Sequence, residues 1–67
     1  MREIIIRLNC CGTNQKIAIN DRAILVGEPN ERRRNVVCLG CGKLVILEFS
    51  AEDGQAHCVN QEIIDTK

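Results

Sequence analysis

The sequence predicts a small, mainly β fold built from antiparallel hairpins. Short apolar runs rich in β-branched residues alternate with clusters of turn formers, which is the pattern of strands joined by tight turns. Four of the five cysteines stand in two clusters, Cys10-Cys11 and Cys38-Leu39-Gly40-Cys41, each at such a turn. A chain of 67 residues buries too little surface to be stable on its core alone, so residues 1–67 are expected to form one metal-stabilised domain.

The first hairpin is expected near the N-terminus. Residues 4–8 form a β-rich apolar run, and residues 16–19 alternate polar and apolar side chains as a half-buried strand does. Between them, residues 10–14 read Cys-Cys-Gly-Thr-Asn, a cluster of turn formers. The two runs therefore predict a hairpin with cysteines at its tip.

The middle of the chain is divided by turn formers. Residues 20–21 (Asn-Asp) end the first hairpin, and residues 23–27 make a third apolar run. Residues 28–31 (Glu-Pro-Asn-Glu) then favour a turn. The next three residues are expected on the same loop: Arg32, Arg33 and Arg34.

The longest apolar run, residues 43–49, is predicted to be the central strand. Its short length and its β-branched content favour a strand over a helix. Residues 34–37 precede the second cysteine cluster and supply the partner run. A second hairpin with cysteines at its tip follows from this pairing.

The C-terminal segment allows two interpretations, of which a strand is preferred. Residues 52–54 (Glu-Asp-Gly) are typical of a type I turn closed by a glycine at positive φ, which would return the chain into a last strand through residues 57–59. The alternative is a short C-terminal helix over residues 55–64, because residues 50–53 resemble a capping box and the following apolar residues have helical spacing. The glycine disfavours that helix by about 1 kcal/mol relative to alanine.

Cys38 and Cys41 have the spacing of a metal-binding knuckle. Zinc takes thiolates at about 2.3 Å in a tetrahedron, and a Cys-x-x-Cys turn delivers two of them. Gly42 follows directly and lets the backbone take a positive φ, so that the amides of the tight turn can point at the sulfurs. The alternative is a pair of buried thiols that act as small hydrophobic side chains.

This arrangement of two hairpins with cysteines at both tips resembles the zinc-ribbon group, whose tips are rubredoxin-type knuckles. Cys38 and Cys41 match one tip residue by residue. The other tip departs from the pattern, because Leu8 stands three residues before Cys11 and the extra thiol is Cys10. Adjacent residues on a strand point to opposite faces, so both thiols of the pair can bind one ion only if the chain turns sharply there.

The resemblance implies a structural zinc site formed by Cys10, Cys11, Cys38 and Cys41. Cys58 is the alternative fourth ligand if the C-terminal segment is a helix, whereas on a strand it would lie roughly 20 Å away at about 3.3 Å per residue. His57 is expected to be solvated rather than a ligand. Four thiolates also suit iron, as in rubredoxin, but the aromatic packing of a rubredoxin iron is missing from a chain whose single aromatic residue is Phe49, so zinc is preferred.

Enzymatic activity is not expected. The chain has one histidine, no evident pair of nucleophile and base, and no glycine-rich phosphate loop. Cys38 and Cys41 also fit a redox dithiol, but such motifs usually open a helix, whereas residues 43–49 are strand-like. A zinc ion with four thiolate ligands has no open position for water, so its role would be structural.

A binding module is the remaining class, and two kinds of partner compete. Arg32, Arg33 and Arg34 are candidate phosphate contacts, and zinc ribbons often serve in nucleic-acid handling. However, nine Lys and Arg balance nine Asp and Glu, and the aromatic residues that stack on bases are absent. A protein partner or a second copy in a homodimer is preferred, bound through an apolar face or a strand edge. Size and architecture suggest regulation of transcription, of translation or of a phage or host machine.

The expected location is the cytoplasm. The chain opens with an apolar run too short for a signal peptide, and it contains no run of about eighteen apolar residues, so no membrane span is expected. Without a secretory signal, an odd number of cysteines favours a reducing compartment, where clustered thiols more often bind metal than form disulfides.

Overall fold

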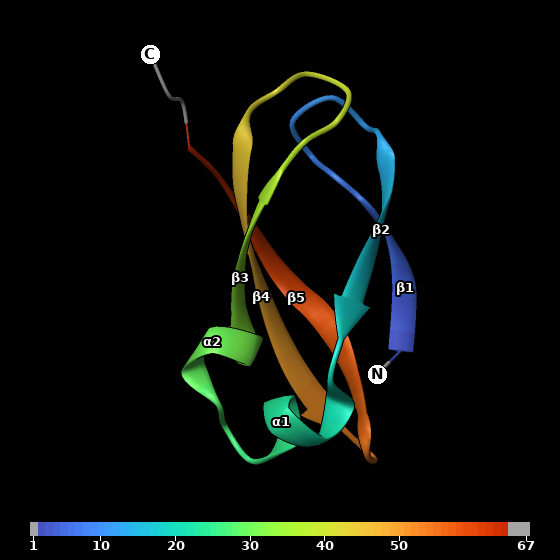
Figure 1. Ribbon diagram of the computed structural model, residues 1–67, viewed down its shortest axis with the longest axis vertical. Helices are drawn as coiled ribbons and strands as arrows, with labels where there is room; N and C mark the ends of the chain where they lie inside the picture. The colour runs from blue at the N-terminus through green and yellow to red at the C-terminus, as the bar shows by residue number, and fades with distance from the viewer. Residues whose placement is uncertain (1, 65–67) are drawn as a thin grey trace.

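The protein is a mainly β structure of two antiparallel sheets (Figure 1). The computed structural model describes residues 2–64, and within that range it contains five strands and two short helices. In chain order the elements are β1 (Arg2–Arg7), β2 (Asn14–Ile19), α1 (Asp21–Leu25), α2 (Pro29–Arg32), β3 (Arg33–Val37), β4 (Leu44–Glu52) and β5 (Gln55–Ile64). The mainly β fold expected from the alternating runs is confirmed.

Both predicted hairpins are present. β1 and β2 form the two-stranded sheet, with a register that runs from Arg2 opposite Ile19 to Arg7 opposite Asn14. In the three-stranded sheet, β4 lies between β3 and β5 and pairs antiparallel with each. The apolar run over residues 43–49 therefore supplies the central strand, as its composition predicts.

The hydrophobic core lies where the apolar sides of the two sheets meet. On β4, Val45, Leu47 and Phe49 are at most 2% exposed, whereas the residues between them are half-buried. This alternation follows from the strand geometry, in which successive side chains point to opposite faces. The buried core residues are Ile6, Leu8, Ile17, Ile19, Ile24, Cys38, Val45, Leu47, Phe49 and Ala56.

The C-terminal segment is the strand β5, so the alternative of a helix over residues 55–64 is wrong. The connection to β4 is also tighter than the expected type I turn. Asp53 and Gly54 both have positive φ, 53° and 79°, as in the mirror-image turns that two-residue hairpin loops prefer. This loop pairs Glu52 with Gln55 and thereby determines the register of the strand that follows.

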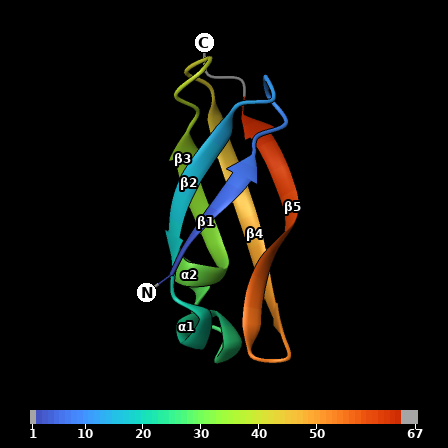
Figure 2. The same ribbon diagram turned by 90° about the vertical axis from the view of Figure 1, so that its right-hand side faces the viewer.

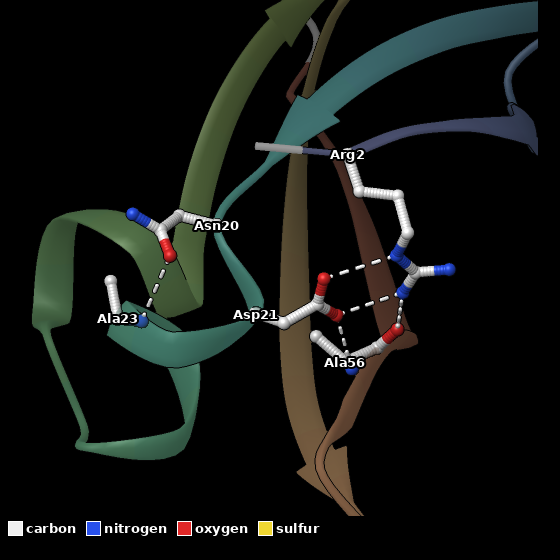
Figure 3. Close-up of polar contacts among 5 residues, drawn as sticks. All are labelled: Arg2, Asn20, Asp21, Ala23 and Ala56. Atoms are coloured by element: carbon white, nitrogen blue, oxygen red, sulfur yellow. Dashed lines mark hydrogen bonds and ion pairs between the residues drawn. The ribbon is translucent and has the colours of Figure 1, made fainter.

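The third apolar run forms a short helix. Asn20 caps it, because its Oδ1 accepts a hydrogen bond from the Ala23 N–H at 3.2 Å (Figure 3). Ile24 is the residue of α1 that is buried in the core. α2 begins at Pro29, whose fixed φ suits the first helical position.

The three consecutive arginines do not lie on a loop, so that expectation is wrong. Arg32 ends α2, and Arg33 and Arg34 begin β3. Neighbours on a strand point to opposite faces, which separates the side chains. Arg34 is turned toward the two-stranded sheet, where its Nη1 donates to the Ala18 carbonyl at 2.9 Å and lies 3.8 Å from Glu31 Oε2. Only two of the three guanidinium groups are therefore well exposed.

A polar clamp joins β1, α1 and β5 near the start of the chain (Figure 3). Arg2 donates to both carboxylate oxygens of Asp21, at 3.0 Å from Nε and 2.8 Å from Nη2. The Ala56 N–H donates to Asp21 Oδ1 at 2.7 Å, and Arg2 Nη2 donates to the Ala56 carbonyl at 2.9 Å. The hydrogen bonds from Arg2, and next the one from Ala56, lower the pKa of Asp21 to about 2.

We expect Asp21→Asn to lower the midpoint of thermal unfolding. The amide keeps the shape of the carboxylate but loses the negative charge that strengthens the hydrogen bonds from Arg2. Since the pKa of Asp21 is lower in the folded state than the ordinary value of 3.8, ionisation stabilises the fold above about pH 4, and the effect is lost only as pH falls toward 2. The difference in midpoint between wild type and variant should thus be constant from pH 6 to pH 8. Thermal unfolding followed by circular dichroism at both values measures it, and a difference that halves between them would contradict this assignment.

Candidate metal centre

The two cysteine-containing tips lie together at the end of the molecule opposite α1 (Figures 1 and 2). The first tip, residues 8–13, joins β1 to β2, and the second tip, residues 38–43, joins β3 to β4. Each tip belongs to a different sheet. A ligand held between them would therefore connect the two sheets at this end, while the clamp of Figure 3 connects them at the other.

The two tips share the same backbone hydrogen bonds. In the second tip, the Cys38 N–H donates to the carbonyl five residues later at 2.9 Å, and the Gly42 N–H donates to the Cys38 carbonyl at 2.8 Å. In the first tip, Leu8 and Gly12 make the same two bonds, again at 2.9 and 2.8 Å. The φ angles of Gly12 and Gly42 are 81° and 78°, values that glycine adopts readily. The tips are thus two copies of one knuckle, and Leu8 occupies the position of Cys38.

The four cysteines of the tips converge. Their sulfurs all lie within 4.8 Å of one another, and the sulfurs of Cys11 and Cys38 are 3.4 Å apart. In a tetrahedral site with metal–sulfur bonds of about 2.3 Å, the sulfurs are separated by slightly less than about 4 Å. These four side chains can therefore hold a metal ion with small adjustments: Cys10, Cys11, Cys38 and Cys41.

Cys10 supplies the thiol that the first knuckle lacks. Leu8 is fully buried in the core, so no sulfur stands at the position equivalent to Cys38. The chain turns at residues 9–11, after the end of β1, and does not hold Cys10 and Cys11 on opposite faces of a strand. The sharp turn that shared binding requires is therefore present, and both sulfurs lie near those of the second tip.

The thiols of the cysteine cluster differ in acidity. Burial raises the pKa of Cys38, but the N–H of Cys41, the thiols of Cys10 and Cys11, and the N–H of Gly40 outweigh burial and bring it below its ordinary value. Burial, followed by hydrogen bonds to the other three thiols, raises the pKa of Cys10. Thiolates this close repel one another, and a bound cation removes that repulsion. The donor set therefore fits a thiophilic metal ion.

Each knuckle is hydrogen-bonded to one glutamine side chain from the other sheet. Gln61 on β5 accepts from the Asn9 N–H at 2.9 Å and donates to the Arg7 carbonyl at 2.9 Å. Gln15 on β2 donates to the Val37 carbonyl at 3.1 Å and accepts from the Leu39 N–H at 3.0 Å. Sequence reasoning missed both residues, because a single glutamine on a strand has no spacing signal.

Gly40 allows the two tips to approach each other. A Cβ atom at this position would overlap Thr13 Oγ1 and lie 3.1 Å from Cys11 Sγ. Thr13 Oγ1 is in turn 3.0 Å from Cys11 Sγ, within hydrogen-bonding distance. The second residue between Cys38 and Cys41 therefore has no room for a side chain.

Cys58 lies outside the cluster. It pairs with Phe49 rather than with Leu47 or Glu48 as expected, because the two-residue loop pairs Glu52 with Gln55 and the register runs unbroken from there to Cys58. Its thiol donates to the Asn60 carbonyl at 3.4 Å. Ile64 is the β5 residue opposite the start of β4, so Cys58 is six residues from the knuckle end, or roughly 20 Å at about 3.3 Å per residue.

The remaining candidates are also apart from the cluster. His57 is exposed and pairs with Ser50, one residue further from the knuckles than Cys58. After Cys41 the chain continues into β4, so the Cys-x-x-Cys segment does not open a helix as redox dithiols usually do.

Comparison of the chain with protein-family models, with curated proteins and with solved structures found no match. Within residues 2–64 no helix has the length and apolar character needed to cross a membrane. The four-cysteine cluster and the surfaces around it are therefore the features that bear on function.

Proposed function

We propose that this protein is a small structural zinc module that acts by contact with another macromolecule. One observation carries the proposal, namely that four cysteine sulfurs from two different sheets lie within 4.8 Å of one another. Zinc suits four thiolates, and the bound metal would connect the two knuckles. Iron suits the same ligands, but the only aromatic residue, Phe49, is on β4 in the core and not around the sulfurs.

A structural role is favoured over a catalytic one. Four thiolates occupy all the coordination positions of a tetrahedral zinc ion and leave none for a water or a substrate. The single histidine, His57, is on the far part of β5 and cannot assist chemistry at the cluster. The proposal therefore includes no enzymatic activity, and a redox role for Cys38 and Cys41 is the less favoured alternative.

A protein partner is favoured over nucleic acid. The net charge is zero, Phe49 is only 2% exposed, and Arg34 is engaged by the Ala18 carbonyl. A phosphate-binding stripe of three arginines is therefore not supported, and stacking on bases has no side chain to use. We propose contacts with a regulatory protein target in the cytoplasm, with a homodimer as the second candidate.

Cobalt substitution tests the metal site. Wild-type protein is expected to bind one Co²⁺ per chain and to show the thiolate charge-transfer and tetrahedral d–d absorption of a four-sulfur site, with displacement by Zn²⁺. Cys58→Ser is the matched control and should titrate like wild type, because Cys58 is outside the cluster. A spectrum without tetrahedral bands, or one that Cys58→Ser abolishes, would refute the proposed site.

A further inference from the structure

A hollow of about 580 Å³ opens beside α2 on the three-stranded sheet. Its lining includes Arg33, Glu48 and Ser50, which are on the face of the sheet turned away from the core, since they alternate with the buried Leu47 and Phe49. The two-stranded sheet packs on the opposite face. This hollow is therefore separate from the cysteine cluster.

The hollow has two cations without partners. Arg32 and Arg33 are exposed, and among residues 2–64 neither makes an ion pair or a side-chain hydrogen bond. The one carboxylate in the lining, Glu48, accepts a hydrogen bond from Asn60 Nδ2 at 2.9 Å and so is already engaged by the neighbouring strand. The residues that line the hollow therefore include two arginines and one carboxylate, although the chain as a whole is neutral.

Apolar groups stand next to these cations. A bulge in β5 leaves Val59 without a partner on β4, and its side chain is 55% exposed in the lining of the hollow. Pro29, the first residue of α2, also lines the hollow. Exposed apolar residues that border unpaired cations are typical of surfaces that bind other proteins.

We infer that this hollow docks an acidic, aliphatic segment of a partner protein, with carboxylates on Arg32 and Arg33 and an aliphatic side chain against Val59. The inference rests on the proposed function and names the chemistry of its partner. Charge complementarity favours an acidic segment, and the apolar wall favours an aliphatic anchor within it. Nucleic acid offers phosphates for the arginines but no aliphatic group for Val59, and the hollow has no exposed aromatic ring for a base.

Heteronuclear NMR titration of the zinc-loaded, full chain tests this docking site. The probe is an acetylated peptide of alternating glutamate and leucine, compared with its glutamine-leucine counterpart and with a single-stranded oligonucleotide of equal charge. We expect the acidic peptide alone to shift the amide signals of Arg32, Arg33, Ser50 and Val59. Arg33→Glu or Val59→Ser should weaken that binding by about tenfold or more. Lys16→Glu, an exposed cation on the two-stranded sheet, is the matched control and should not weaken it.

The controls decide between the alternatives. Any one of four results would overturn the inference. The glutamine peptide could bind as tightly as the acidic peptide, or the oligonucleotide could bind more tightly than the acidic peptide. Lys16→Glu could weaken binding as much as Arg33→Glu does, or no probe could shift the signals. The zinc content and the dispersion of the spectrum are recorded on the same sample. A folded, zinc-loaded protein that ignores the acidic peptide thus refutes only the docking site, whereas loss of zinc would refute the metal module itself.

Discussion

Removal of the metal with a chelator is expected to unfold the protein, and addition of zinc should refold it. Zinc binding supplies about 10–16 kcal/mol in zinc-finger peptides, which is comparable with the total stability of about 5–15 kcal/mol of ordinary domains. This chain is expected to need such help, because a domain of 67 residues buries little surface and its core contains a single aromatic side chain. Circular dichroism and NMR dispersion before and after chelation measure the effect.

A double variant provides the sharper form of this result. Cys38→Ser with Cys41→Ser removes both ligands of the second knuckle and should leave the protein unfolded even in excess zinc. Cys58→Ser is the control that changes a thiol on β5, and it should unfold on chelation and refold with zinc as wild type does. A folded double variant would show that the metal does not hold the sheets together.

The second large effect concerns Leu8 and Cys10. Since Leu8 occupies the position of Cys38 in the first knuckle, Leu8→Cys should place a sulfur where a regular knuckle has one. If four ligands share about 10–16 kcal/mol, Cys10→Ser alone should cost on the order of 3 kcal/mol, about a hundredfold in metal affinity. The combination of Leu8→Cys with Cys10→Ser is expected to recover most of that loss.

A change at Leu8 also loses packing in the core, and this loss of stability has to be measured separately from the change in metal affinity. Leu8 is fully buried, so Leu8→Ala is expected to destabilise the loaded protein by about 2–5 kcal/mol. This variant keeps all four thiols and reports the packing loss alone. Competition with a chromogenic chelator gives the four affinities. If the double variant Leu8→Cys with Cys10→Ser binds the metal no more tightly than Cys10→Ser alone, the two knuckles are not equivalent.

The strands could be predicted because their signals are local. Residues 43–49 are a short β-branched run, and the alternation over residues 16–19 defines which face is buried. Cys38 and Cys41 were identifiable for the same reason, since a Cys-x-x-Cys turn followed by glycine is a compact pattern. In each case a few neighbouring residues contain the whole signal.

The features that sequence reasoning missed depend on contacts between distant residues. Gln15 and Gln61 each form hydrogen bonds at a knuckle of the other sheet, and nothing in their own sequence neighbourhoods indicates these contacts. Arg34 was grouped with its neighbours, but the pleat of β3 directs it to the Ala18 carbonyl. The residues around Asp53 suit a type I turn as well as its mirror image, and the twist of the paired strands decides between the two.

The central claim, that Cys10 completes the metal site and Cys58 does not, is most directly tested by proton–cadmium correlation NMR of protein loaded with cadmium-113. Scalar coupling through the metal–sulfur bond identifies each ligand by its β protons. We predict correlations from Cys10, Cys11, Cys38 and Cys41, all to a single cadmium resonance, because in the described part of the chain these are the sulfurs that lie within 4.8 Å of one another. A correlation from Cys58, or the absence of one from Cys10, would contradict this structure of the site.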